Sequence, residues 1–202
     1  MKHRHRYQAP RANQGFSVLE LIVVVSLLGI VAAIALPMAQ PALKSYEIGG
    51  RAHAVAYEVA LAKMQAASGF TQARLYVDLS NNSYHIETWN KATNAWVVQG
   101  AVASLPSGIG FGFSTLATPP SNTQGVIGQA SACHDASDQV VASTACVLFN
   151  SRGVPVDTTG TPTGADAVYL TDGGMVYGVT VTPAGLTQLW STPARTAAWQ
   201  KQ

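Results

Sequence analysis

One acidic residue, Glu20, interrupts the most apolar run of the chain. The run covers residues 16–36, reads FSVLELIVVVSLLGIVAAIAL, and contains Glu20 as its single charge. A charge inside a membrane-length apolar segment costs about 2.5–3.5 kcal/mol on insertion scales, so such a residue usually has a partner. If the chain is cut after Gly15, the new α-amine of Phe16 supplies a positive charge that a neighbouring copy can present to Glu20. The spacing therefore predicts an intermolecular ion pair that sets the stagger between subunits, favoured by a low dielectric.

The segment that carries Glu20 is long enough to cross a membrane. At 1.5 Å per residue, a helix over residues 16–36 spans about 30 Å, the thickness of a bilayer's hydrocarbon core. Residues 1–15 are polar and basic, with Lys2, Arg4, Arg6 and Arg11. By the positive-inside rule this leader stays in the cytoplasm, so the remainder of the chain is expected on the far side of the membrane.

The other residues that could do chemistry do not form a convincing catalytic site. His134, Asp135 and Asp138 could be drawn as metal ligands, but they lie in a Ser- and Ala-rich stretch where solvated polar residues are favoured. The chain contains no GxSxG, HExxH or phosphate-binding loop. We therefore predict a protein that is not an enzyme, with no catalytic residue, no metal and no cofactor.

The charge balance argues against a broad nucleic-acid surface. Four of the twelve basic residues precede Gly15, so the remaining eight are outnumbered by ten acidic residues. Binding to phosphates needs clustered lysine and arginine, and the sequence after the leader has no such cluster.

The two cysteines, Cys133 and Cys146, are thirteen positions apart and lack the spacing of a zinc site. If this part of the chain lies outside the cytoplasm, we expect them to form a disulfide. Closing a loop of this size stabilises a fold by about 3 kcal/mol in the chain-entropy model. The alternative is two separate buried thiols.

The rest of the chain predicts an α+β fold. The helical pattern continues over residues 37–69, where Gly69 supplies a stop signal. The period changes to two from Arg74, and residues 80–82 make a good hairpin turn. We expect a long N-terminal helix whose second half packs on an antiparallel β-sheet domain over residues 70–190, followed by a polar, mobile tail over residues 191–202.

The run Gly15-Phe16-Ser17-Val18-Leu19-Glu20, followed by the apolar stretch, resembles the class III signal of type IV pilins and type II secretion pseudopilins. The resemblance implies that a prepilin peptidase cuts between Gly15 and Phe16 and methylates the new Phe16 amine. It also implies that Pro37 kinks the helix, because the family often carries a proline at that place. Two alternatives remain: an ordinary signal peptide cleaved after Ala33-Ile34-Ala35, or a plain membrane anchor without an assembly role.

The segment from Phe149 to Gly153, followed by a hairpin and a last strand, resembles the H-type minor pseudopilin family, GspH/FimT. This implies a minor subunit of a type II secretion pseudopilus. The alternative is a FimT-like minor type IV pilin that acts in pilus biogenesis or DNA uptake. Since Arg195 and Lys201 are the only cations after Trp190, nucleic acid is the less favoured partner.

The expected partners and location follow from the same resemblance. The partners are major and minor pilin-like subunits, the prepilin peptidase, an inner-membrane assembly platform and membrane lipid. We expect a single-pass protein of the bacterial inner membrane with a cytoplasmic N-terminus and a periplasmic C-terminal domain, later incorporated into the filament. A monomeric, membrane-anchored binding module is the rival class if Glu20 is dispensable.

Overall fold

The computed structural model describes residues 17–202, and the side chains of all of these except 36–42. The first element is helix α1, Val18–Ser68. The chain divides into two compact units between Leu43 and Lys44. In the first unit, Val18–Ala35 has a mean hydropathy of 2.8 and none of it is buried, so this stretch is long and apolar enough to cross a membrane.

In the second unit, α1 presents one stripe of small and branched side chains to the core. The stripe repeats every three or four residues, the spacing of one helix face. It consists of Ile48, Ala52, Val55, Val59, Ala62 and Ala66, all fully buried. Gly49 lies beside this stripe, where a Cβ would stand 3.2 Å from the Tyr177 hydroxyl, so glycine lets the helix approach that ring.

The helix ends where the sequence predicts, but the residue that terminates it is not the predicted one. Phe70, and not Gly69, takes the left-handed conformation, with φ 47°. The Thr71 amide donates to the Ala66 carbonyl at 3.2 Å, which completes a Schellman-type cap.

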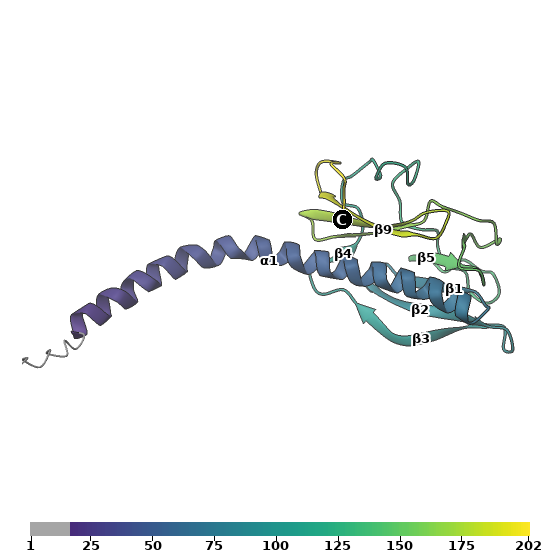
Figure 1. Ribbon diagram of the computed structural model, residues 1–202, viewed down its shortest axis with the longest axis horizontal. Helices are drawn as coiled ribbons and strands as arrows, with labels where there is room; N and C mark the ends of the chain where they lie inside the picture. The colour runs from purple at the N-terminus through teal and green to yellow at the C-terminus, as the bar shows by residue number, and fades with distance from the viewer. Residues whose placement is uncertain (1–16) are drawn as a thin grey trace, which may run out of the picture. The chain divides into compact units, whose positions relative to one another are not determined.

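Ten strands form two antiparallel sheets in the second unit (Figure 1). The first sheet has the order β3-β2-β1-β5-β6. Its strands are β1 Ala73–Asp78, β2 Ser83–Asn90, β3 Ala95–Ser104, β5 Thr144–Phe149 and β6 Pro155–Val156. The second sheet has the order β10-β9-β8-β7-β4. Its strands are β4 Gly110–Phe111, β7 Ala167–Thr171, β8 Met175–Val181, β9 Thr187–Pro193 and β10 Gln200–Lys201.

The hairpin of β1 and β2 forms as the alternation and turn residues predict. Asp78 accepts hydrogen bonds from the Ser80 and Asn81 amides, both at 2.9 Å, and Asn82 has φ 48°. Hydrogen bonds from Ser80 and Asn81 lower the pKa of Asp78 to about 2. This local chemistry fixes the register, in which Arg74 lies opposite Glu87 and Ala73 opposite Thr88.

The main core lies between α1 and the inward faces of both sheets. Leu75, Val147, Phe149 and Val179 join the helix stripe in one cluster. A second, smaller cluster lies on the other face of the second sheet, around Tyr169, which is fully buried. The strands β7 and β8 are therefore covered on both faces, which explains why their sequence is apolar at successive positions.

Two of the edge strands differ in length. Strand β3, at an edge of the first sheet, runs from Ala95 to Ser104 and pairs with β2 across a bulge between Tyr84 and Ile86. Strand β4, at an edge of the second sheet, is only two residues long.

The structure corrects the prediction for residues 191–202, which were expected to be a mobile tail. Strand β9 continues to Pro193, and β10 pairs with it. The ring of Trp199 packs on that of Tyr169, with centroids 5.8 Å apart, and its indole N–H donates to the Thr118 carbonyl. Apolar burial and strand pairing hold this segment in place, although its sequence is mostly polar.

The α+β fold class, with an apolar N-terminal helix followed by antiparallel sheets, is confirmed.

Candidate functional site

The start of α1 is built as a capped helix N-terminus around Glu20. The Glu20 amide donates to the Ser17 hydroxyl oxygen at 3.1 Å. Ser17 and Glu20 thus have the spacing of a capping box, in which the cap residue precedes an acidic residue by three positions. Glu20 lies in the first turn, where the helix dipole favours a negative charge. Its side chain is exposed and therefore accessible to another molecule.

The helix that follows Glu20 exposes its apolar side chains on every face. The large apolar residues from Val18 to Ile34 have exposed fractions between 48 and 76%. Ser26 satisfies its hydroxyl inside the helix by donating to the Ile22 carbonyl at 2.8 Å. A helix that is apolar all round must be covered by lipid or by other helices, so this segment needs apolar surroundings.

Three of the predicted site residues have no described side chain. The cleavage position between Gly15 and Phe16, the methylation of Phe16 and the whole leader lie outside the described residues. The backbone at Pro37 is helical, but its side chain also lies outside the described part, so the kink remains a prediction.

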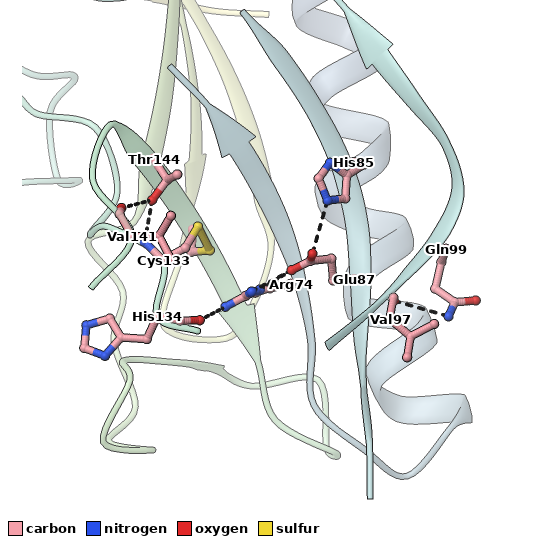
Figure 2. Close-up of polar contacts among 10 residues, drawn as sticks. Arg74, His85, Glu87, Val97, Gln99, Cys133, His134, Val141 and Thr144 are labelled. Carbon is pink, nitrogen blue, oxygen red and sulfur yellow. Dashed lines mark hydrogen bonds and ion pairs between the residues drawn. A yellow bond between two sulfur atoms is a disulfide. The ribbon is translucent and has the colours of Figure 1, made fainter. Parts of the chain in front are cut away.

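Cys133 and Cys146 are joined by a disulfide, with an S–S distance of 2.03 Å (Figure 2). Cys146 belongs to β5, and Cys133 belongs to the irregular segment that precedes this strand. Thr144 reinforces the connection, because its hydroxyl accepts from the Cys133 amide at 2.9 Å and donates to the Val141 carbonyl at 2.6 Å. The disulfide therefore holds the segment around Cys133 against the first sheet.

A buried ion pair lies beside the disulfide segment. Arg74 on β1 donates through Nε to Glu87 on β2 at 2.6 Å, and both side chains are almost fully buried (Figure 2). Arg74 also donates through Nη1 to the His134 carbonyl at 2.6 Å, and its guanidinium lies 3.9 Å from the centre of the Trp96 ring. His85 approaches the other oxygen of Glu87 at 3.2 Å. Burial lowers the pKa of Arg74, and the charge of Glu87 opposes this effect.

The acidic residues considered as metal ligands have structural partners. His134 pairs with Asp138 at 2.7 Å, and Asp135 accepts from the Ser137 and Gln139 amides. Across residues 17–202 no group of three or more His, Cys, Asp and Glu side chains is placed to hold a metal ion.

The N-terminal residues match a known family. Residues 10–36 match the family described as the prokaryotic N-terminal methylation motif. The chain carries this methylation motif. The match includes Gly15, Phe16 and Glu20, the residues on which the resemblance to prepilin-type signals rests, so that resemblance is confirmed.

Beyond the methylation motif, similarity to known proteins is low. No curated protein sequence matches the chain significantly. Among solved structures, the minor pseudopilin EpsH from the type 2 secretion system of Vibrio cholerae is similar with a TM-score of 0.44 and 10% sequence identity. The alignment covers 74% of this chain and 99% of that chain.

Sequence reasoning missed the pairing of Arg74 with Glu87. A signal for it was available, because a turn between Asp78 and Ser83 pairs each residue of β1 with a defined residue of β2. Once that register is drawn, Arg74 and Glu87 are opposite one another, and opposite charges at directly paired positions stabilise a sheet.

We predict that Arg74→Met destabilises the second unit by about 3–5 kcal/mol, because it leaves the Glu87 carboxylate buried without its partner. Thermal unfolding of the full chain in non-ionic detergent, followed by near-UV circular dichroism, measures this. The double variant Arg74→Met, Glu87→Leu should recover most of the loss. The exposed control Arg195→Met should change stability by no more than about 0.5 kcal/mol. A loss below about 1 kcal/mol in Arg74→Met would contradict this account of the pair.

Asp166, which precedes β7, gives the fold a pH dependence. Burial raises the pKa of Asp166 to about 6, with a further contribution from the charge of Asp157. The Asp166 Oδ2 atom is buried and has no hydrogen-bond partner among the described residues. Because the pKa is higher in the folded than in the unfolded state, folding takes up a proton between about pH 4 and pH 6.

We predict that the wild-type chain loses about 2 kcal/mol of stability relative to Asp166→Asn as the pH rises from 4 to 7. The penalty is absent below about pH 3, where the carboxyl is protonated in both states, and is complete once the pH has passed the folded pKa. Unfolding of both proteins at pH 4, 5, 6 and 7 measures the difference. A wild-type-to-variant difference that stays constant across this range would refute the assignment.

Proposed function

We propose that the chain is a minor pseudopilin of a type II secretion system, made as a precursor and assembled through its apolar N-terminal helix. The observation that carries the proposal is the match of residues 10–36 to the methylation motif. This motif places Glu20 in the first turn of a helix that is long and apolar enough to cross a membrane. Prepilin peptidase would cleave between Gly15 and Phe16 and methylate the Phe16 amine.

The geometry around Glu20 supports an assembly role. Its carboxylate is exposed at the capped start of the helix, and the following apolar side chains need a cover outside the chain. Pairing of Glu20 with the Phe16 amine of a neighbouring subunit neutralises both charges in an environment of low dielectric. Assembly would then cover the apolar helix and the charge together, with neighbouring helices taking the place of lipid.

The disulfide supports the proposed topology. Disulfides persist in oxidising compartments such as the bacterial periplasm and are rare in the cytosol. The Cys133–Cys146 bond belongs to the second unit, so this unit would lie in the periplasm while the basic leader stays in the cytoplasm. A single helix of the inner membrane would connect them before the subunit is extracted into the filament.

The turn from Phe149 to Gly153 supports the H-type assignment within the pseudopilins. Phe149 is fully buried in the main core, and Gly153 has φ 71°, which favours glycine. A Cβ on Gly153 would stand 3.2 Å from the Lys63 side chain, and the Lys63 ammonium donates to the Gly185 carbonyl at 2.9 Å. Gly153 and its neighbours thus lie where α1 contacts two turns, the one at Gly153 and the one at Gly185.

The proposed activity is that of a structural subunit and needs no catalytic residue in this chain. The FimT-like alternative with DNA uptake gains no support from the C-terminal segment. Lys201, one of its two cations, lies 5.9 Å from the centre of the Trp190 ring, and Arg195 is exposed by itself. Two cations give weak and salt-sensitive binding to phosphates.

The first prediction is the processing of the precursor. We expect membrane-extracted protein co-expressed with a prepilin peptidase to start at N-methylated Phe16, and protein made without the peptidase to retain the leader. Intact mass and N-terminal sequencing measure both. A start at Leu36 would indicate ordinary signal-peptide cleavage after Ala35 and would overturn the proposal.

The second prediction is the role of Glu20 in assembly. We expect Glu20→Ala to be cleaved as well as wild type but to enter filaments at least tenfold less, because an unpaired Phe16 amine costs more than about 1.4 kcal/mol. Sheared-filament fractions quantified by immunoblotting measure incorporation. Glu47→Ala is the matched control, since Glu47 is an exposed acidic residue of the same helix. If Glu20→Ala entered filaments as well as wild type does, Glu20 would have no role in assembly, and the helix would act only as a membrane anchor.

A further inference from the structure

A groove of about 230 Å³ lies on the outer face of the first sheet, away from α1. Its floor comes from residues of neighbouring strands, including Arg74 of β1, Leu148 of β5 and Val156 of β6. The indoles of Trp89 on β2 and Trp96 on β3 line it as well. Arg74, Leu148 and Val156 lie at directly paired positions of β1, β5 and β6. Trp89 lies opposite Trp96, two positions along β2 from Glu87, the partner of Arg74, so the groove runs across the strands.

Two loops complete the walls of the groove. One is the segment around His134 and Asp135, which the Cys133–Cys146 disulfide holds against β5. The other runs from Asp157 to Asp166, between β6 and β7. The groove therefore has a floor of apolar and aromatic side chains together with the buried Arg74, and walls made of two polar loops, one of them covalently fixed.

The charge available to a ligand in the groove is negative. The lining residues Asp135, Asp138, Asp157 and Asp166 bring four carboxyl groups. Arg74 is the sole arginine or lysine among the described lining residues, and each of its three side-chain nitrogens already contacts Glu87 or the His134 carbonyl. His134 also lines the groove, and its ring pairs with Asp138 at 2.7 Å. Its side chain is only 6% exposed, so an anionic ligand has little access to it.

The oxygens that remain open point to a hydrogen-bond donor as the ligand. The backbone amides of the two loops use Oδ1 of Asp135 and Oδ1 of Asp157. Within the described residues, Oδ2 of each of these aspartates forms no hydrogen bond, and Asp157 is exposed. A cation with several N–H groups can therefore bind at the rim while its planar face lies on the apolar floor.

We propose that this groove is a docking site for an arginine side chain of a protein partner. Arginine matches both features, because a planar guanidinium stacks on indole and pairs with carboxylates, and it gives up its hydration more readily than an ammonium does. The groove already contains this arrangement, because the guanidinium of Arg74 lies over Trp96 and pairs with Glu87. The partner's arginine would repeat these contacts at the surface, with its guanidinium on an indole and paired with a carboxylate.

The docking site stands apart from assembly through α1. It belongs to the second unit alone, on the sheet face opposite the helix stripe. An arginine peptide tests it without a filament, so failure of one proposal leaves the other unaffected.

The experiment uses the full chain in non-ionic detergent with ¹⁵N in tryptophan alone, titrated with acetyl-glycyl-arginyl-glycinamide. We expect the indole signals of Trp89 and Trp96 to shift with a dissociation constant of about 1 mM, the strength of one stacked ion pair. Trp190 and Trp199 serve as internal controls, because their indole N–H groups bind Thr180 and Thr118 outside the groove. The neutral citrulline peptide has the same shape and should bind at least fivefold more weakly.

The matched variants separate charge from fold. Asp135→Asn with Asp157→Asn keeps the Oδ1 acceptors that cap both loops but removes two charges, and it should weaken arginine binding at least fivefold. Asp172→Asn makes the same change at a turn outside the groove, where Oδ1 accepts from the Gly174 and Met175 amides, and should bind as wild type does. Equal binding of the arginine and citrulline peptides, unchanged binding by the double variant, or no shift of Trp89 and Trp96 at about 10 mM peptide would each overturn the proposal.

Discussion

The apolar surface of α1 is the constraint on which the rest of the molecule depends. In the second unit this surface is a stripe from Ile48 to Ala66, and two sheets supply its cover. In the first unit it surrounds the helix from Val18 to Ala35, and the described chain supplies none of the cover. One helix thus needs two apolar environments: the interior of its own fold for its second half, and a membrane or other helices for its first half.

The charged residues also differ between the two units. Glu20 stands at the exposed start of the helix, where we propose that its partner comes from another molecule. Arg74 and Glu87 are buried together inside the fold, where each satisfies the other. A buried ion pair adds little net stability compared with apolar packing, but it penalises any register that separates its members. The pair therefore favours the β1–β2 register in the same way that Glu20 is proposed to favour one stagger between subunits.

The disulfide connects stability with recognition. Cys133–Cys146 fixes a polar loop against β5, and this loop forms one wall of the groove beside Trp96. The carbonyl of His134 in the same loop accepts from Arg74, so the covalent bond and the buried charge hold one segment from two directions. An oxidising compartment would thus be needed both to complete the fold and to shape the surface that a partner meets.

The sequence by itself determined the features that depend on local order along the chain. The methylation motif, the apolar length after Phe16, the Asp78 turn and the end of α1 near Ser68 follow from neighbouring residue types, because caps, turns and helix periodicity act over a few positions. Tertiary structure alone decided what depends on distant partners. The order of residues 191–202 rests on Trp199 meeting Tyr169, and the groove exists because separate loops close over paired strands. Such contacts are set by how the sheets pack, which no local pattern in a single sequence specifies.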